Sequence, residues 1–238
     1  MSVDGALWIW DAAFAVSVDP ESGEVLKRID LFEVHEENQD IDIYGIWRID
    51  SVDASNWASD PMHANDVEPL PASLASALLM FEPGDLLISM RSLNLLSVVD
   101  PVTVKVKWWR FGIGRRLRKP DWGPDGTIVF FDSNTNPGHS RLRSVDPSDY
   151  SVTDIVKGEG YEFFSPRRGR HSVREDGSVV VVSACQGSLS GVDPSGDIVF
   201  EFVNKYEDCF DKVARISDGL VLPPDYFETM PRCETNPG

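Results

Sequence analysis

Short apolar segments separated by polar turns recur along most of this chain. Each recurring unit begins with a glycine, continues as an apolar strand and, after a turn and a second strand, ends in Asp-Pro. Another turn then leads into a third strand. We find four copies of this unit, at residues 5–20, 84–101, 126–147 and 177–194. Short strands with turns about every ten residues predict an all-β fold.

The spacing of the Asp-Pro pairs favours one all-β architecture. Asp100, Asp146 and Asp193 are 46 and 47 residues apart, and a four-stranded propeller blade takes about 40 to 50 residues. Repetition of this unit favours a β-propeller over a sandwich. Four copies predict an incomplete or short ring of about four to five blades. The first copy begins close to Met1, so two alternatives stay open: N-terminal blades of longer relatives are missing, or two chains complete one ring.

We expect residues 1–238 to form a single β-propeller-like domain. Asp19 and Asp100 are 81 residues apart, so the second unit carries an insertion. This insertion, residues 31–83, is acidic and is expected to be irregular, with a short helix at residues 71–80 that Ser73 or the preceding turn caps. Residues 206–238 are expected to form a C-terminal tail.

The charge of the chain narrows the range of ligands. With 39 acidic and 22 basic side chains the net charge is −17, which repels nucleic acid and anionic lipid over most of the surface and excludes a general nucleic-acid role. The basic side chains nevertheless form two clusters. They are Arg115, Arg116, Arg118 and Lys119 in the first, and Arg167, Arg168 and Arg170 in the second. The clusters indicate either a small anionic ligand or two solvated loops.

Neither a membrane segment nor a metal site is visible in the sequence. The longest apolar runs have the length of strands, far below the roughly 20 residues that span a bilayer, and the N-terminus lacks the pattern of a secretory signal. Three cysteines, Cys185, Cys209 and Cys233, stand at unrelated spacings, which matches neither a zinc site nor a disulfide framework. The redox compartment stays open.

Candidate chemistry lies in the segments just before the glycine-led strands. In a propeller these segments enter the innermost strands, so equivalent points of neighbouring blades converge on the axis. His63, Arg118 and His171 occupy similar points of the repeat and are predicted to share a pocket. For any one histidine the alternative is an ordinary hydrogen-bonded or surface residue, which is the interpretation we favour for His35 and His139.

The same segments carry a family resemblance. The motif His63-Ala64-Asn65-Asp66-Val67-Glu68 is followed by motifs at residues 84–94, 120–126, 131–133, 140–141, 169–171, 192–204 and 223–227. Together these motifs resemble the bacterial arylsulfotransferase family over about residues 60–227.

The resemblance implies a function as well as a fold. Members of that family are six-bladed propellers that move a sulfuryl group from a phenolic sulfate to another phenol, without a nucleotide donor, by a ping-pong route through a sulfo-histidine. The resemblance implies that neither a cofactor nor a metal is needed, and that the ligands are small aromatic sulfates and phenols. Carried over by position, His171 is the nucleophile, His63 contacts the phenolic oxygen or sulfuryl group, and Arg141 holds the sulfuryl oxygens. Asn65, Arg91 and Arg170 are then substrate-binding.

One departure from the family pattern keeps a second hypothesis open. Where the family has Gln-His-Asp before Pro-Asp, this chain has Leu117-Arg118-Lys119. Arginine binds sulfuryl oxygens bidentately but stays protonated, so it cannot accept the proton of an acceptor phenol. The chain is therefore either an enzyme using His171, His63, Arg141 and Arg118, or a noncatalytic propeller that binds an anionic or aromatic ligand or a protein partner.

Self-association to complete a ring is a further expectation. Location stays open, because relatives are commonly exported and this chain shows no export signal.

Overall fold

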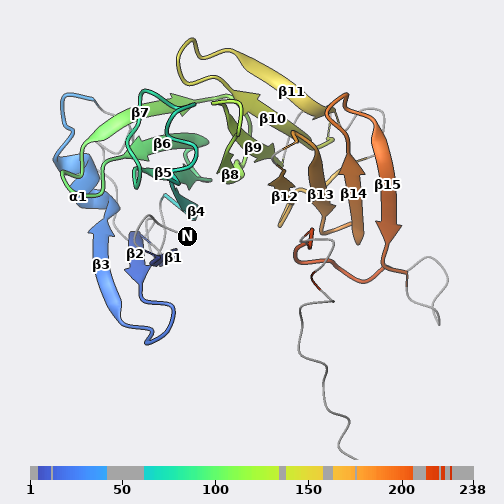
Figure 1. The fold of residues 1–238 in the computed structure, drawn as a ribbon, viewed down its shortest axis with the longest axis horizontal. Helices are drawn as coiled ribbons and strands as arrows, with labels where there is room; N and C mark the ends of the chain where they lie inside the picture. The colour runs from blue at the N-terminus through green and yellow to red at the C-terminus, as the bar shows by residue number, and fades with distance from the viewer. Residues whose placement is uncertain are drawn as a thin grey trace, which may run out of the picture.

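The computed structural model describes most of the chain (Figure 1). The described residues are 5–11, 13–41, 62–133, 138–157, 163–174, 176–205, 213–219, 221, 222 and 226. Cys209 and Cys233 lie outside them. Within the described part, no helix is long and apolar enough to cross a membrane.

The described strands form antiparallel sheets whose strands follow chain order. The first sheet holds β1 (Leu7–Asp11), β2 (Phe14–Val18) and β3 (Val25–Asp30), and helix α1 (Leu31–Glu36) follows it. The second holds β4 (Ala64–Pro69), β5 (Leu86–Met90), β6 (Leu95–Val99) and β7 (Val106–Phe111). The third holds β8 (Arg118–Trp122), β9 (Ile128–Asp132), β10 (Arg141–Val145) and β11 (Val152–Lys157). The fourth holds β12 (Arg170–Val173), β13 (Val179–Ser183), β14 (Ser188–Val192) and β15 (Ile198–Val203).

The sheets are arranged as neighbouring blades around one centre. Figure 1 shows them in an arc that runs from the first sheet, in blue, to the fourth, in orange. The first strand of each sheet faces the centre, and β1 contacts β4, β4 contacts β8, and β8 contacts β12. The all-β fold with four-stranded propeller blades is therefore confirmed. Within the described residues the first sheet has three strands and begins directly at its glycine-led strand.

Three of the glycine-led strands, β5, β9 and β13, are almost entirely apolar because neighbouring blades cover both of their faces, whereas β1 is largely exposed. All five residues of β5, of β9 and of β13 are buried. In β9, Ile128 and Phe130 pack in the core between the second and third sheets, whereas Val129 and Phe131 pack in the core between the third and fourth. Alternate side chains of a strand point to opposite faces, so one strand fills two cores.

The Asp-Pro pairs mark turns that the aspartate side chain itself stabilises. In every copy the carboxylate accepts a hydrogen bond from the backbone N–H two residues further on, an arrangement that closes the turn locally. The pairs are Asp19 with Glu21, Asp100 with Val102, Asp146 with Ser148 and Asp193 with Ser195, at 2.8, 2.7, 2.8 and 2.9 Å. The aspartate therefore explains the recurring motif as much as the proline does.

The prediction of a helix at residues 71–80 is wrong. The segment forms consecutive turns, with Leu74 N–H donating to Pro71 O and Leu78 N–H to Ala75 O. These turns carry Leu78 and Phe81 into the core between the second and third sheets, and that packing outweighs helix propensity. Residues 42–61 of the stretch expected to be irregular lie outside the described residues. The described part of this stretch contains α1, which the Asp30 side chain caps, and the inner strand β4.

Candidate functional site

Both basic clusters of the sequence meet at a single cavity of about 720 Å³. We call it the arginine cavity, and the residues that line it are Trp10, His63, Asn65, Arg91, Arg116, Arg118, Arg167, Arg168 and Arg170. Arg118 is the first residue of β8 and Arg116 lies just before it, while Arg170 is the first residue of β12 and follows Arg167 and Arg168. Because β8 and β12 are neighbouring inner strands, two clusters that are remote in sequence face one space.

Several residues of the cavity wall have a backbone conformation that non-glycine residues rarely adopt. The φ angles of His63, Arg116 and Arg168 are 49°, 54° and 63°. Hydrogen bonds fix this backbone, since the N–H of Arg91 donates to His63 O at 3.0 Å and that of Arg116 donates to Asn94 Oδ1 at 2.6 Å. Left-handed non-glycine residues cluster at binding and catalytic sites, so their gathering here supports a functional cavity.

A smaller cavity of about 290 Å³ adjoins the arginine cavity, with which it shares Asn65, Arg118, Arg168 and Arg170. Its wall includes the carboxylate of Asp66. Burial first, and then the nearby charge of Glu68, raise the pKa of Asp66 to about 7. Its Oδ2 atom is buried without a hydrogen-bond partner among the described residues. Asp66 is thus a carboxyl group that exchanges a proton near neutral pH beside a cationic cavity.

The inner strands β4, β8 and β12 carry a set of interacting titratable groups, which we call the axial cluster: Asp66, Glu68, Lys119, Asp121 and His171. The Nζ atom of Lys119 lies 2.9 Å from Asp121 Oδ1, and His171 Nε2 lies 3.0 Å from Asp121 Oδ2. Burial works against ionisation of Asp121, but His171 and Lys119 outweigh it and lower the pKa of this carboxyl. The axial cluster therefore holds Asp121 as an anion between two nitrogen groups.

The structure separates the predicted site residues into three groups. His63, Asn65, Arg91, Arg118 and Arg170 line the arginine cavity. His171 follows Arg170 on β12, but its side chain is 0% exposed and faces Asp121. Arg141 lies on β10, where its guanidinium contacts Asp132 at 3.2 Å and Asp154 at 3.5 Å, and it does not line the cavity.

Four wall residues were not among the predicted site residues: Trp10, Arg116, Arg167 and Arg168. The charge clusters were the signal for the three arginines, because they mark an anion site in an acidic chain. Trp10 carried no such signal. Its ring lies 6.5 Å from that of His63 at a tilt of 46°, a contact between the first and second sheets that spacing along the chain does not reveal.

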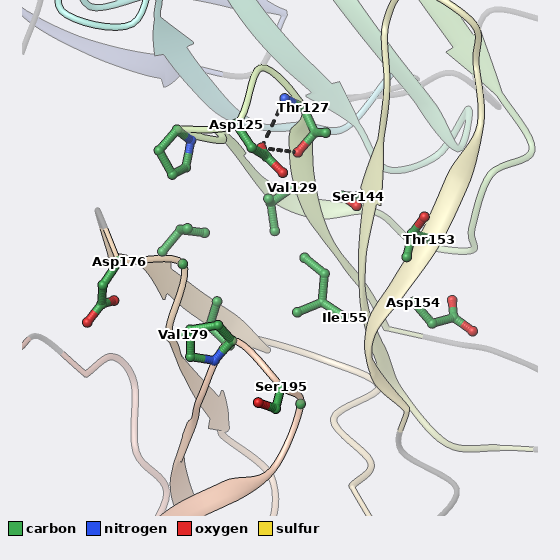
Figure 2. A pocket seen from close by; sticks show the side chains of 15 residues that line it. Asp125, Thr127, Val129, Ser144, Thr153, Asp154, Ile155, Asp176, Val179 and Ser195 are labelled. Atoms are coloured by element: carbon green, nitrogen blue, oxygen red, sulfur yellow. Dashed lines mark hydrogen bonds between the residues drawn. The ribbon is translucent and has the colours of Figure 1, made fainter. Parts of the chain in front are cut away.

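A second large hollow offers different chemistry. Figure 2 shows this hollow, of about 590 Å³, between the third and fourth sheets, with Asp125, Asp154 and Asp176 among its lining residues. Thr127 donates to Asp125 Oδ1 within it. Carboxylates repel an anionic ligand, so this hollow is the poorer candidate for one. Among the described residues no three His, Cys, Asp or Glu side chains are grouped so that they could hold a metal ion.

Comparisons with known proteins place these observations in context. The fold is similar to that of virginiamycin B lyase from Staphylococcus aureus (TM-score 0.49, 14% identity, 85% of this chain and 53% of that one). It is also similar to hydrazine synthase from Kuenenia stuttgartiensis (TM-score 0.49, 15% identity, 84% and 47%). The chain thus spans about half the length of these structures. No curated protein matches it, whereas a family model described as arylsulfotransferase (ASST) matches residues 3–205.

Proposed function

This chain belongs to the arylsulfotransferase (ASST) family, and on that premise we propose that it transfers a sulfuryl group between phenolic compounds in the arginine cavity. The observation that carries the proposal is the wall of that cavity, in which six guanidinium groups, one imidazole and one indole surround about 720 Å³. Such a concentration of cations in a chain of net charge −17 favours an anionic substrate. A volume of this size holds a small aromatic molecule.

The arginines supply the electrostatic part of the proposed reaction. A migrating sulfuryl group spreads negative charge over three equatorial oxygens, as a phosphoryl group does, so fixed cationic donors that face it stabilise the transition state. Guanidinium groups match such oxygens with paired N–H donors. Trp10, in the same wall, offers an aromatic face to the ring of the substrate.

Of the two candidate histidines, His63 is the better placed to receive the sulfuryl group. It lines the arginine cavity and is half-buried, whereas the side chain of His171 is 0% exposed and lies against Asp121. In the proposed first step a nitrogen of His63 attacks the sulfur, an N–S bond forms, and the S–O bond breaks to release the phenolate. In the second step the acceptor oxygen attacks the sulfur, the N–S bond breaks, and the acceptor's proton leaves.

We propose that Asp66 accepts the proton that the acceptor phenol loses in the second step. Arg118, at the position of a family histidine, remains a cation, while Asp66 lines the adjoining cavity together with Arg118. With a pKa of about 7, its carboxylate form accepts the proton of the acceptor phenol, and its protonated form returns a proton to the leaving phenolate. This assignment removes the difficulty that the arginine creates for an active enzyme.

Intact mass spectrometry after incubation with 4-nitrophenyl sulfate tests the proposal. We expect the wild-type protein to gain the mass of one SO₃ group, the His63→Ala variant to gain none, and a His139→Ala control to behave as wild type. An adduct that disappears in His171→Ala and persists in His63→Ala would assign the nucleophile to His171, as the family resemblance implies. No adduct in any folded variant would contradict transfer through histidine.

The role of Asp66 has its own test, because it concerns the second step. In Asp66→Asn we expect the initial release of 4-nitrophenol to persist, since this phenolate leaves without a proton, while transfer to a phenol acceptor slows about 100-fold. An Asp176→Asn variant, changed at an exposed carboxylate, is the control. Equal slowing of both steps would show that Asp66 only supports the structure of the site.

A noncatalytic function is the second candidate, and two observations favour it. Arg118 replaces a residue that is histidine in the family, and His171 is closed off against Asp121. In that case the arginine cavity binds an anionic aromatic ligand without changing it. Binding of 4-nitrophenyl sulfate by a protein that forms no adduct and releases no 4-nitrophenol would establish this alternative.

A further inference from the structure

The arginine cavity holds more positive charge than one sulfuryl group neutralises. Six arginines line it, and among its described lining residues none is acidic. One of the six, Arg170, lies 3.5 Å from Asp218, an ion pair in which both side chains are about half exposed. Exposed pairs of this kind contribute little. A phenolic sulfate brings a single negative charge, so it leaves most of the guanidinium charge of the wall uncompensated.

The guanidinium groups act on one another across the cavity. Burial first, and then the charges of Arg91, Arg170, Arg116 and Arg168, lower the pKa of Arg118 to about 10. Its Nε atom is buried without a hydrogen-bond partner among the described residues. Two like charges about 4 Å apart repel each other by about 1 kcal/mol in water and by more where the dielectric constant is lower. An anion that reaches several of them relieves this repulsion.

The backbone that carries two of the arginines is also fixed before a ligand arrives. The left-handed backbone of Arg116 is fixed by Asn94, and the carbonyl of Arg167 accepts a hydrogen bond from Ser165 Oγ at 2.9 Å. A backbone that is already fixed loses less entropy when a ligand binds. Each guanidinium presents a planar set of N–H groups that suits the oxygens of sulfate or phosphate. The cavity wall thus combines a fixed backbone with several arginines, and its volume has room for more than one anionic group.

We propose that the ligand of the arginine cavity is a small molecule that carries at least two sulfate or phosphate groups. The inference deepens the proposed function and rests on it only for the aromatic part of the ligand. The volume of about 720 Å³ is within the range of cavities that enclose drug-sized molecules. A long polyanion such as nucleic acid fits poorly, because the chain as a whole has a net charge of −17.

Calorimetric titration at fixed low ionic strength tests the number of anionic groups. The probes are 4-nitrophenyl sulfate with one group, 1,4-phenylene bis-sulfate with two sulfates, and inorganic pyrophosphate with two phosphates. We expect at least one two-group probe to bind about tenfold more tightly than the monosulfate. Comparison of the bis-sulfate with pyrophosphate shows whether the cavity prefers sulfate or phosphate groups. Affinities within about twofold of one another would overturn the inference.

Matched variants show whether the cavity is responsible. Arg116→Gln and Arg168→Gln are each expected to weaken the preferred two-group probe about tenfold and the monosulfate less than threefold. Arg174→Gln, an exposed arginine outside the cavity wall, is the control and should leave both affinities unchanged. A loss in Arg174→Gln as large as in Arg168→Gln would contradict the assignment of the site.

Thermal unfolding provides a readout that does not depend on catalysis. Without ligand, Arg116→Gln and Arg168→Gln are expected to unfold at a higher temperature than wild type, because one repelling charge is gone. The preferred probe should raise the unfolding temperature of wild type more than that of either variant. Lower stability of both unliganded variants would contradict the inference. Tighter binding of a two-group probe without an SO₃ adduct would contradict the proposed transfer and support this inference. An SO₃ adduct together with equal affinities for all probes would support the transfer and contradict this inference.

Discussion

Replacing Trp108 with alanine is expected to lower the free energy of unfolding by about 4 kcal/mol. Trp108 is an outer-strand residue of the second sheet, but its side chain is 1% exposed and reaches the third sheet. Its Nε1–H donates to Pro147 O at 3.1 Å, and its ring stacks on Tyr150 with centroids 6.2 Å apart. Truncation therefore removes core packing between two blades together with a hydrogen bond.

The neighbouring tryptophan provides a matched control for this prediction. Trp109 points to the opposite face of β7 and is only partly buried against another core, so Trp109→Ala is expected to lower stability by less than about half as much. Trp108→Phe should fall between the two, because it keeps the aromatic contact and loses the hydrogen bond. Chemical denaturation measures all three. Equal losses for Trp108→Ala and Trp109→Ala would contradict a special role of Trp108 between the blades.

Stability is expected to fall as the pH rises from about 4.5 to 7. Burial is the main cause that raises the pKa values of Asp66 and Glu68 to about 7, from ordinary values of 3.8 and 4.5. Between the ordinary and the folded-state values, the folded protein binds protons that the unfolded chain has released, so each carboxyl favours unfolding as the pH rises. The expected loss is on the order of 3 kcal/mol for each carboxyl and is complete above about pH 7.

Denaturation curves of wild type and of the double variant Asp66→Asn with Glu68→Gln measure this effect. The high net charge of the chain also destabilises it as carboxylates ionise, and the comparison separates the two causes. We expect the variant to be the more stable protein at pH 8 and to show a flatter dependence between pH 5 and 7. Parallel curves would mean that neither carboxyl retains its proton in the folded state.

Much of the fold could be predicted from the repeat, because residues close together in the sequence determine the strands and turns of each repeat unit. The glycine-led strands β5, β9 and β13 are buried along their whole length because neighbouring blades cover both of their faces, and the Asp-Pro turns are closed by hydrogen bonds within a few residues. The predicted helix at residues 71–80 failed because Leu78 and Phe81 pack in a core between two sheets. Contacts of that kind depend on how the blades are arranged, and helix propensity carries no information about that arrangement.

The candidate site was predictable in its charge but not in its assembly. The sequence displays Arg116 and Arg168 as members of two separate clusters, and only the adjacency of β8 and β12 joins them. The burial of His171 against Asp121 was equally hidden, because Asp121 is one residue of a short inner strand. Asp66 lay within a recognised motif, yet its unusual acidity depends on burial and on Glu68, which a motif does not report.

The placement of a cationic cavity in a strongly acidic chain has a kinetic consequence. Outside the cavity, within a Debye length of the surface (about 10 Å at 0.1 M salt), an approaching anion is repelled by the net charge of −17. Once inside the cavity it responds to the guanidinium groups around it. Added salt weakens both interactions, so it speeds the arrival of the ligand and also its departure. The exchange of ligand therefore accelerates with salt more steeply than its equilibrium affinity declines.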